Sequence, residues 1–176
     1  MVSKAEGRVV SGDKLDVVLG ESQRIVRRRG DFVIAETRHG FVCASAGVDA
    51  SNAPEASALV LLPDDPDASA ARLHERLGVA VIVSDSFGRP WRQGTTDVAI
   101  GVAGLAPLID YRGQSDSTGY ELSSTVVAVA DEIASAAELV KGKIAGVPAA
   151  IVRGLAPGGN GTARELVLPA ERDLFR

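Results

Sequence analysis

The chain has 176 residues and a formal net charge of −4, with hydrophobic residues at 45% and charged residues at 24% of its composition. These are the proportions of an ordinary globular domain, and the acidic balance excludes a global field that would attract nucleic acid. No apolar run reaches the roughly 20 residues of a membrane span, so we expect a cytoplasmic protein with neither membrane nor nucleic acid as a partner.

Hydrophobic residues at helical intervals predict a first helix over residues 15–26 that stops before Gly30. The basic run over residues 24–29 would then form the C-terminal end of this helix, where cations interact favourably with the terminal carbonyl groups. Two short β-rich runs, residues 31–36 and 41–44, follow with a polar turn between them and predict a strand–turn–strand unit.

A βαβ-like unit is predicted next. Residues 58–62 form an apolar run typical of a buried strand. Asp65 is a suitable N-cap and Pro66 a suitable first helical residue, so we expect a helix from there to Leu77. The fully apolar run over residues 79–83 predicts a central strand of the sheet.

The second half of the chain predicts short strands at residues 97–101 and 107–111 and a long helix after them. Residues 118–121 fit a capping box, and an apolar stripe over residues 122–140 has helical spacing. A last strand is expected at residues 147–152. Together these elements predict one α+β domain, with a mixed sheet and packed helices.

Two apolar runs each deliver an aspartate followed by small polar residues. Asp49 is followed by Asn52, and Asp85 by Ser86. Oxygen ligands of this kind suit magnesium or manganese, and two such ions clamp the attacking and leaving oxygens in a phosphoryl transfer. The same residue types also form Asx turns that satisfy backbone amides, so both interpretations stay open.

The sequence contains no phosphate-binding loop of the Gly-Lys-Ser/Thr kind, because Gly142-Lys143 is followed by Ile144. A bound nucleotide would therefore be held by metal ions, lysines and loop amides. Cys43 lies in an apolar stretch and is expected to be a buried structural thiol. His39 lies in a turn, where it either assists chemistry or makes a stabilising hydrogen bond.

Three arginines flank the aspartate segments, namely Arg38, Arg89 and Arg92. Guanidinium groups bind carboxylates and phosphates in a bidentate manner, which suits a site for anionic substrates. The alternative is that they form salt bridges to Asp97, Asp110 or Asp116.

Segments spread over nearly the whole chain resemble the coenzyme F420:L-glutamate ligase family. The two longest are Glu36-Thr-Arg-His-Gly-Phe-Val-Cys-Ala-Ser-Ala-Gly-Val-Asp49-Ala-Ser-Asn52 and Val83-Ser-Asp85-Ser-Phe-Gly-Arg-Pro-Trp-Arg92. The others, in chain order, are residues 2–8, 62–67, 97–101, 110–113 and 130–134.

The resemblance implies a GTP-dependent enzyme that joins L-glutamate to the carboxylate of a coenzyme F420 precursor by an amide bond, through an acyl phosphate. It also implies two divalent ions, Mg²⁺ or Mn²⁺, together with K⁺, a homodimer, and a fold particular to the family. It assigns no catalytic residue.

By position, the resemblance makes Asp49 and Asp85 metal ligands and Ser86 a ligand of the second metal. Lys4 and Asn52 would contact GTP. Lys143 falls where archaeal members have a glutamine that contacts metal and nucleotide. A protonated lysine cannot ligate a divalent ion, but it could contact a GTP phosphate directly.

Family members have a further N-terminal stretch before the segment at residues 2–8. The resemblance therefore implies one ligase-type domain over residues 1–176, truncated at its N-terminus and without the reductase domain that follows in several relatives. A truncated, inactive chain that acts as a scaffold or binding subunit is the alternative function.

Overall fold

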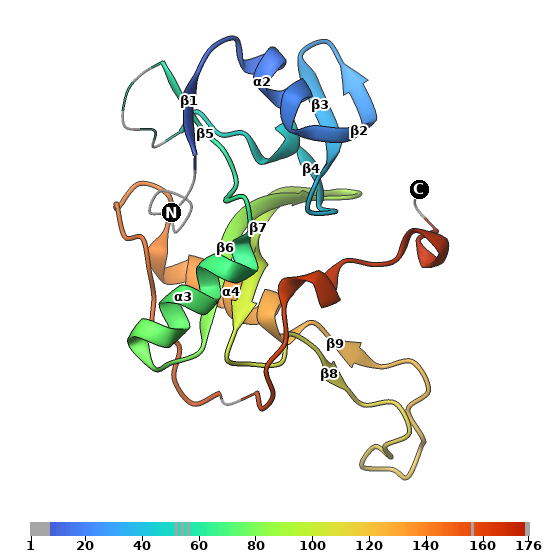
Figure 1. The fold of residues 1–176 in the computed structure, drawn as a ribbon. Coiled ribbons are helices and arrows are strands. Elements are labelled where there is room, and N and C mark those ends of the chain that lie inside the picture. The colour runs from blue at the N-terminus through green and yellow to red at the C-terminus, as the bar shows by residue number, and fades with distance from the viewer. Residues whose placement is uncertain (1–7, 52, 54, 56, 156, 175–176) are drawn as a thin grey trace.

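The computed structural model describes residues 8–51, 53, 55, 57–155 and 157–174. The first third of the chain forms one part of the molecule, and a long hairpin with two helices forms the other (Figure 1). A second, shorter hairpin projects from the body. No helix in the described ranges combines the length and the apolar composition needed to cross a lipid bilayer.

The first part contains one helix and two small antiparallel sheets. Strand β1 (Val9–Ser11) pairs with β5 (Ala58–Val60), and β3 (Phe32–Thr37) lies between β2 (Ser22–Arg29) and β4 (Val42–Ala44). Helix α2 (Lys14–Glu21) packs against them. The core of this first part is built from small and branched apolar side chains, namely Val18, Val33, Ala35, Ala46, Val48, Leu59 and Leu61.

The prediction of one helix over residues 15–26 is wrong beyond Glu21. Ser22 already has an extended backbone, with φ −89° and ψ 124°, and the chain continues as β2. The backbone of this segment pairs with β3, and the ion pair between Arg24 and Glu36, 2.8 Å, joins the two strands. The basic run over residues 24–29 therefore lies on an exposed strand and not at a helix end.

The second part consists of a long antiparallel hairpin covered by two helices. Strands β6 (Val81–Arg89) and β7 (Arg92–Ala103) form the hairpin, with α3 (Pro66–Leu77) and α4 (Val129–Lys141) packed against it. Helix α3 agrees with the prediction: Asp65 Oδ1 accepts from the Ala68 N–H, and Gly78 ends the helix in the left-handed conformation at φ 67°.

The α+β class is confirmed, but the βαβ unit is wrong. Strands β5 and β6 belong to different sheets, and β6 pairs with its sequence neighbour β7. All strand pairs among the described residues are antiparallel, so four small antiparallel sheets replace the single mixed sheet. A tight turn at Pro90 and Trp91 makes the local pairing available, and local pairing requires no crossover.

The long helix begins later than predicted. Residues 126–127 form β9, which pairs with β8 (Ile109–Asp110), so the helix cannot start before Val129. The Thr118 hydroxyl donates to Asp116 in a loop and does not cap a helix. The strand expected at residues 147–152 has no regular secondary structure.

The outer edge of β7 is closed by side chains instead of by another strand. The N–H groups of Asp97, Ala99 and Val102 donate to Glu138, Asp131 and Asp67 at 2.8–3.1 Å, and Gly104, directly after the strand, donates to Asn160 at 3.1 Å. Unpaired backbone groups on an edge strand favour pairing with other chains, and these acceptors satisfy them. The same contacts hold α4 and α3 against the hairpin.

Consecutive residues after β5 connect the two parts of the molecule. Leu61 belongs to the core of the first part, and Leu62 to the core under the hairpin with Ala70, Val83 and Ile100. Both leucines are almost fully buried. The junction between the two parts is therefore held in place by packing on both sides.

We predict that Gly101→Ala strongly destabilises the fold. A Cβ at Gly101 would lie 2.1 Å from the Pro66 carbonyl oxygen at the start of α3. Because backbone cannot move aside cheaply, urea denaturation should show a loss of about 3 kcal/mol in the free energy of unfolding. Gly88→Ala in the same hairpin meets nothing within 4 Å and should change it by less than about 0.5 kcal/mol. Equal losses in both variants would contradict the packing argument.

Candidate functional site

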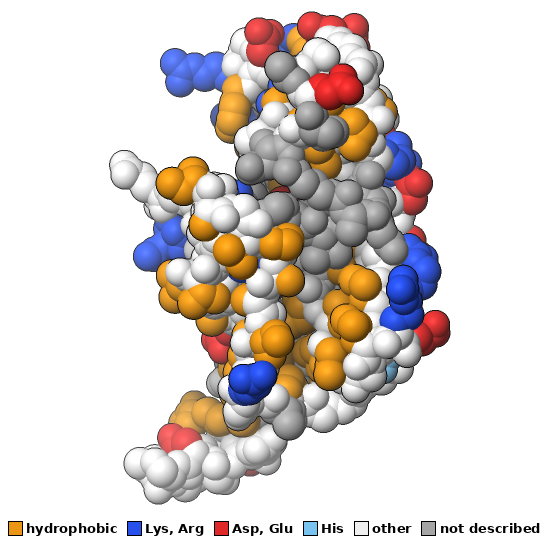
Figure 2. Space-filling view, turned by 90° about the vertical axis from the view of Figure 1, so that its left-hand side faces the viewer, with side chains coloured by type: hydrophobic (Ala, Val, Ile, Leu, Met, Phe, Trp, Pro, Cys, Tyr) orange, Lys and Arg blue, Asp and Glu red, His pale blue; other side chains and the backbone are white. Residues whose placement is uncertain are grey.

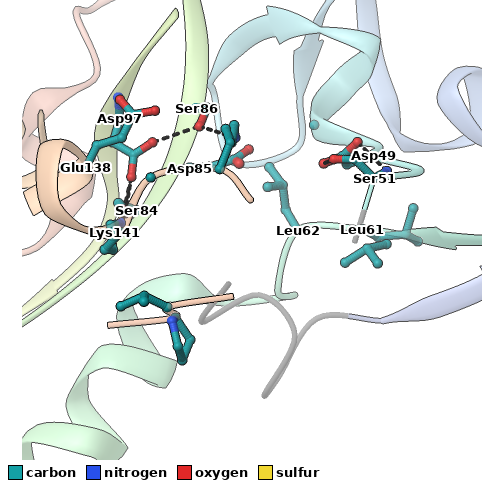
Figure 3. A pocket seen from close by; sticks show the side chains of 16 residues that line it. Asp49, Ser51, Leu61, Leu62, Ser84, Asp85, Ser86, Asp97, Glu138 and Lys141 are labelled. Carbon is teal, nitrogen blue, oxygen red and sulfur yellow. Dashed lines mark hydrogen bonds and ion pairs between the residues drawn. The ribbon is translucent and has the colours of Figure 1, made fainter. Parts of the chain in front are cut away.

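A pocket opens at the junction of the two parts of the molecule (Figure 3). Its walls come from the segment around Asp49, from the residues after β5, from β6 and β7, and from the end of α4 with the loop that follows. Its volume is about 90 Å³. This is well below the roughly 300 Å³ of a small-molecule site, so the described walls fit ions and a phosphate group.

Asp49 reaches the pocket through a strained turn. Ser45, Ala46 and Gly47 all have positive φ, at 52°, 50° and 74°. Two of them are not glycine, and a conformation that costs energy at such residues is kept only where the surroundings enforce it. After the turn, Asp49 forms a two-hydrogen-bond bridge with Val60, with N···O distances of 2.9 and 2.7 Å.

The Asp49 carboxylate also accepts from Ser51. The backbone N–H of Ser51 donates to Oδ1 at 2.8 Å, and its hydroxyl donates to Oδ2 at 2.5 Å. The Asx-turn interpretation of this motif is therefore confirmed. It does not exclude a ligand, because Asp49 still lines the pocket.

Asp85 stands on β6, opposite Val98 of β7, and lies between Asp49 and a second polar cluster (Figure 3). Burial raises the pKa of Asp85 to about 6. The nearby Asp49 carboxylate raises it too, whereas the Ser86 N–H and the Lys143 charge oppose the shift. A cation bound beside Asp85 would remove the cost of ionising it.

The second polar cluster is centred on Asp97, which is 5% exposed. Oδ2 accepts from Lys141 Nζ at 2.7 Å and from Ser84 Oγ at 3.0 Å, and Oδ1 accepts from Ser86 Oγ at 2.7 Å. Burial alone would raise the pKa of Asp97, but the bonds from Lys141, Ser86 and Ser84 and the charge of Lys141 hold it below its ordinary value. Asp97 is therefore an ionised, fully partnered carboxylate.

Lys143 lies at the mouth of the pocket. Its Nζ donates to Ser86 Oγ at 2.7 Å. The loop that carries it starts at Gly142, whose φ of 59° ends α4 directly after Lys141. The anchored Lys141 thus places the second lysine beside Ser86.

The structure brings together four of the six predicted site residues, namely Asp49, Asp85, Ser86 and Lys143. Lys4 and Asn52 lie outside the described residues. Sequence reasoning missed Asp97, Lys141 and Glu138 as pocket residues. The available signal was the Ser-Asp-Ser pattern of residues 84–86 with Asp97 across a hairpin, which puts both hydroxyls on the side of Asp97 once the register is known.

The donor set fits a hard divalent cation. Asp49 and Asp85 offer carboxylate oxygens, which Mg²⁺ and Mn²⁺ prefer. Within the described ranges no group of three His, Cys, Asp or Glu side chains is placed to hold one ion. An ion at Asp49 and Asp85 would therefore complete its shell with water and phosphate oxygens, as Mg²⁺ commonly does.

The flanking arginines do not line the pocket. Arg38 pairs with Asp64, and Arg89 Nη2 donates to the Gln93 carbonyl at 3.0 Å. The three aspartates expected as salt-bridge partners are occupied elsewhere: Asp97 by Lys141, Asp110 by Arg112, and Asp116 by the Thr118 hydroxyl.

His39 and Cys43 have structural surroundings. His39 Nε2 lies 2.9 Å from the Pro63 carbonyl oxygen and 3.1 Å from that of Asp64, which agrees with the turn-stabilising interpretation. Burial raises the pKa of the Cys43 thiol to about 12. Cys43 is thus a structural thiol, as predicted.

Comparison with known proteins gives a consistent picture. A family model described as F420-0:Gamma-glutamyl ligase matches residues 1–154. The chain is 44% identical to a coenzyme F420:L-glutamate ligase of Methanothermobacter thermautotrophicus over 206 positions, which cover 100% of the chain and 81% of that protein. The chain is 41% identical over 204 positions to the protein of this name from Methanocaldococcus jannaschii, covering 100% of the chain and 81% of that protein. It is 44% identical over 208 positions to the one from Methanopyrus kandleri, covering 100% of the chain and 82% of that protein. The matched spans exceed 176 positions, so the relatives carry residues inside them that this chain lacks.

We predict that Lys141→Met lowers the free energy of unfolding by about 3 kcal/mol at neutral pH, because Asp97 would keep a buried charge without its partner. The folded-state pKa of Asp97 is lowered, so the contribution of the pair is present at neutral pH and is lost as pH falls below about 4. Urea denaturation between about pH 2.5 and 7 should therefore show the two proteins converging on acidification. The exposed Lys14→Met serves as the control, and a loss that does not change with pH would contradict the role of the ion pair.

Asp85→Asn should stabilise the metal-free protein at high pH. Because the folded-state pKa of Asp85 is raised, its buried charge destabilises the folded state at high pH. This destabilisation is absent below about pH 4 and complete above about pH 6. In EDTA, the variant should gain on the order of 2 kcal/mol at pH 8 and nothing at pH 4. Asp31→Asn, at an exposed position, is the control. A gain that is the same at both pH values would show that ionisation of Asp85 is not its cause.

Proposed function

The chain belongs to the F420-0:Gamma-glutamyl ligase family, and we propose that it is a GTP-dependent ligase that adds L-glutamate by an amide bond to a coenzyme F420 precursor. The observation that carries this proposal is the meeting of Asp49, Asp85, Ser86 and Lys143 in one pocket. These residues come from distant segments, and together they offer what a phosphoryl transfer needs, which is oxygen ligands for a metal ion and a positive charge.

In the proposed reaction, the carboxylate of the precursor attacks the γ-phosphoryl group of GTP, and the bond to the bridging oxygen breaks. The products of this step are an acyl phosphate and GDP. The amine of L-glutamate then displaces phosphate and forms the amide bond. A Mg²⁺ or Mn²⁺ ion held by Asp49 and Asp85 would neutralise charge on the phosphoryl oxygens. K⁺, and contacts of GTP with Lys4 and Asn52, belong to the same proposal.

The chain's own residues would orient the phosphate and limit access of water. Lys143 presents an ammonium at the mouth of the pocket, where it can contact a phosphate oxygen. Leu61, Leu62, Val147 and Pro148 add apolar surface to the lining of the same pocket. Apolar lining that excludes water favours transfer of the acyl phosphate to the amine over hydrolysis.

We also propose that the protein is a homodimer. Apolar side chains at and after the end of α4 are highly exposed, with Leu139 at 87%, Ile144 at 99% and Ile151 at 81%. Figure 2 shows hydrophobic side chains gathered on the face along which this segment runs. An apolar patch of this kind is typical of an interface, and light scattering after gel filtration should give twice the mass of the chain.

Asp49→Ala and Asp85→Ala should each lower ligase activity by at least about 100-fold, since each removes a carboxylate of the proposed metal site. The measurement is product mass after incubation with GTP, manganese, L-glutamate and the precursor. Asp31→Ala, at an exposed aspartate that does not line the pocket, should retain activity. Full activity in both pocket variants would contradict the site.

The alternative, an inactive scaffold, makes the opposite prediction. A purified chain that folds, but neither binds GTP in the presence of Mn²⁺ nor forms product, would favour it. Metal-dependent turnover of GTP that requires both the precursor and glutamate would exclude it.

A further inference from the structure

We propose that the ammonium of Lys143 takes the place of a second divalent cation, so that the site uses one divalent ion, held by Asp49 and Asp85. This inference rests on the proposed function, and it concerns how the charge of the phosphoryl group is balanced. Two-metal sites place a divalent ion on each side of the reacting phosphoryl group. The family resemblance makes Ser86 a ligand of the second of these ions.

The hydrogen bonds of Ser86 decide which cation it can accept. A serine hydroxyl has one proton and two lone pairs. The proton of Ser86 goes to Asp97 Oδ1 at 2.7 Å, and Lys143 Nζ donates to the same hydroxyl oxygen at 2.7 Å. One lone pair of Ser86 Oγ therefore accepts from the ammonium of Lys143, which lies beside the oxygen that a second ion would bind.

A divalent ion and the Lys143 ammonium cannot share this oxygen. An ion bound to Ser86 Oγ would lie roughly 2.1 Å from it, hence within a few ångströms of Nζ. Two positive charges at that separation repel each other strongly beside a partly buried pocket. Either Lys143 leaves, or the second ion is excluded.

The carboxylate that is hydrogen-bonded to Ser86 has its charge balanced by Lys141. Asp97 Oδ1 accepts from the Ser86 hydroxyl, and Oδ2 accepts from Lys141 Nζ and the Ser84 hydroxyl. Glu138 accepts the N–H of Asp97. The other two aspartates among the described residues that line the pocket, Asp49 and Asp85, are assigned to the first ion.

The position of Lys143 is built into the fold. Lys141 is fixed by its ion pair to Asp97, and Gly142 turns the chain at φ 59°, so that Lys143 follows at a set place beside β6. Its charge acts on Asp85 as well. A positive charge held at the pocket in advance can stabilise negative charge that develops on a phosphoryl group.

The test counts metal ions directly. Full-length protein with one equivalent of GDP is titrated with MnCl₂, and free Mn²⁺ is read by its electron paramagnetic resonance signal. We expect one tightly bound Mn²⁺ per chain in the wild type. Lys143→Gln removes the charge and supplies a neutral oxygen, so it should bind two. Lys143→Arg keeps the charge and should bind one. Thermal unfolding by circular dichroism checks that the variants fold.

Activity gives a second readout. The rate should depend on Mn²⁺ with a Hill coefficient near one in the wild type. In Lys143→Gln the rate should fall by about 10- to 100-fold at low Mn²⁺ and recover partly at high Mn²⁺, with a steeper dependence.

Two Mn²⁺ per chain in an active wild type would overturn this inference and leave the proposed ligase function intact. One Mn²⁺ in both the wild type and Lys143→Gln would overturn it too, because the lysine would then exclude nothing. A folded wild type that binds no Mn²⁺ and forms no product would overturn the proposed function itself.

Discussion

The buried ion pair between Asp97 and Lys141, 2.7 Å, is the interaction on which the site depends. Its side chains are 7% and 15% exposed, so the pair is shielded from water, and loss of either partner would leave a costly charge. Asp97 belongs to the middle of β7 and Lys141 to the last turn of α4. The pair therefore joins the hairpin to the helix at the point where the pocket opens. The Ser84 and Ser86 hydroxyls donate to the same Asp97 carboxylate, which fixes their orientation.

Docking of α4 and assembly of the pocket are one structural event. Asp131 and Glu138 of α4 accept N–H groups from the outer edge of β7, which satisfies an edge strand that would otherwise be open. The same helix then delivers Lys141 and, through Gly142, Lys143. On the other side of the pocket, Asp49 is held by its bridge to Val60. Leu61 packs in the core of this side and Leu62 in the core under the hairpin, so the two leucines fix the position of this side relative to the hairpin.

Predictions from the sequence were reliable where the signals are local. Asp65, Pro66 and Gly78 each act within a few residues of themselves, and α3 has the predicted bounds. They failed where a backbone segment found a distant partner. Residues 22–26 have helical spacing but pair with β3, and residues 126–127 continue the apolar stripe of α4 but pair with β8. Hydrophobic spacing indicates that one face of a segment is buried, but it does not indicate which other strand the backbone of that segment pairs with.

The sequence by itself determined the family, the α+β class and the chemistry of the aspartate motifs, because these depend on residue types in order along the chain. It also placed Asp49, Asp85, Ser86 and Lys143 among the candidates. Only the tertiary structure decided that the paired Asp97 and Lys141 line the same pocket, and that Lys143 donates to Ser86. The reason is that hairpin register and helix docking are set by contacts between residues tens of positions apart, which no local pattern encodes.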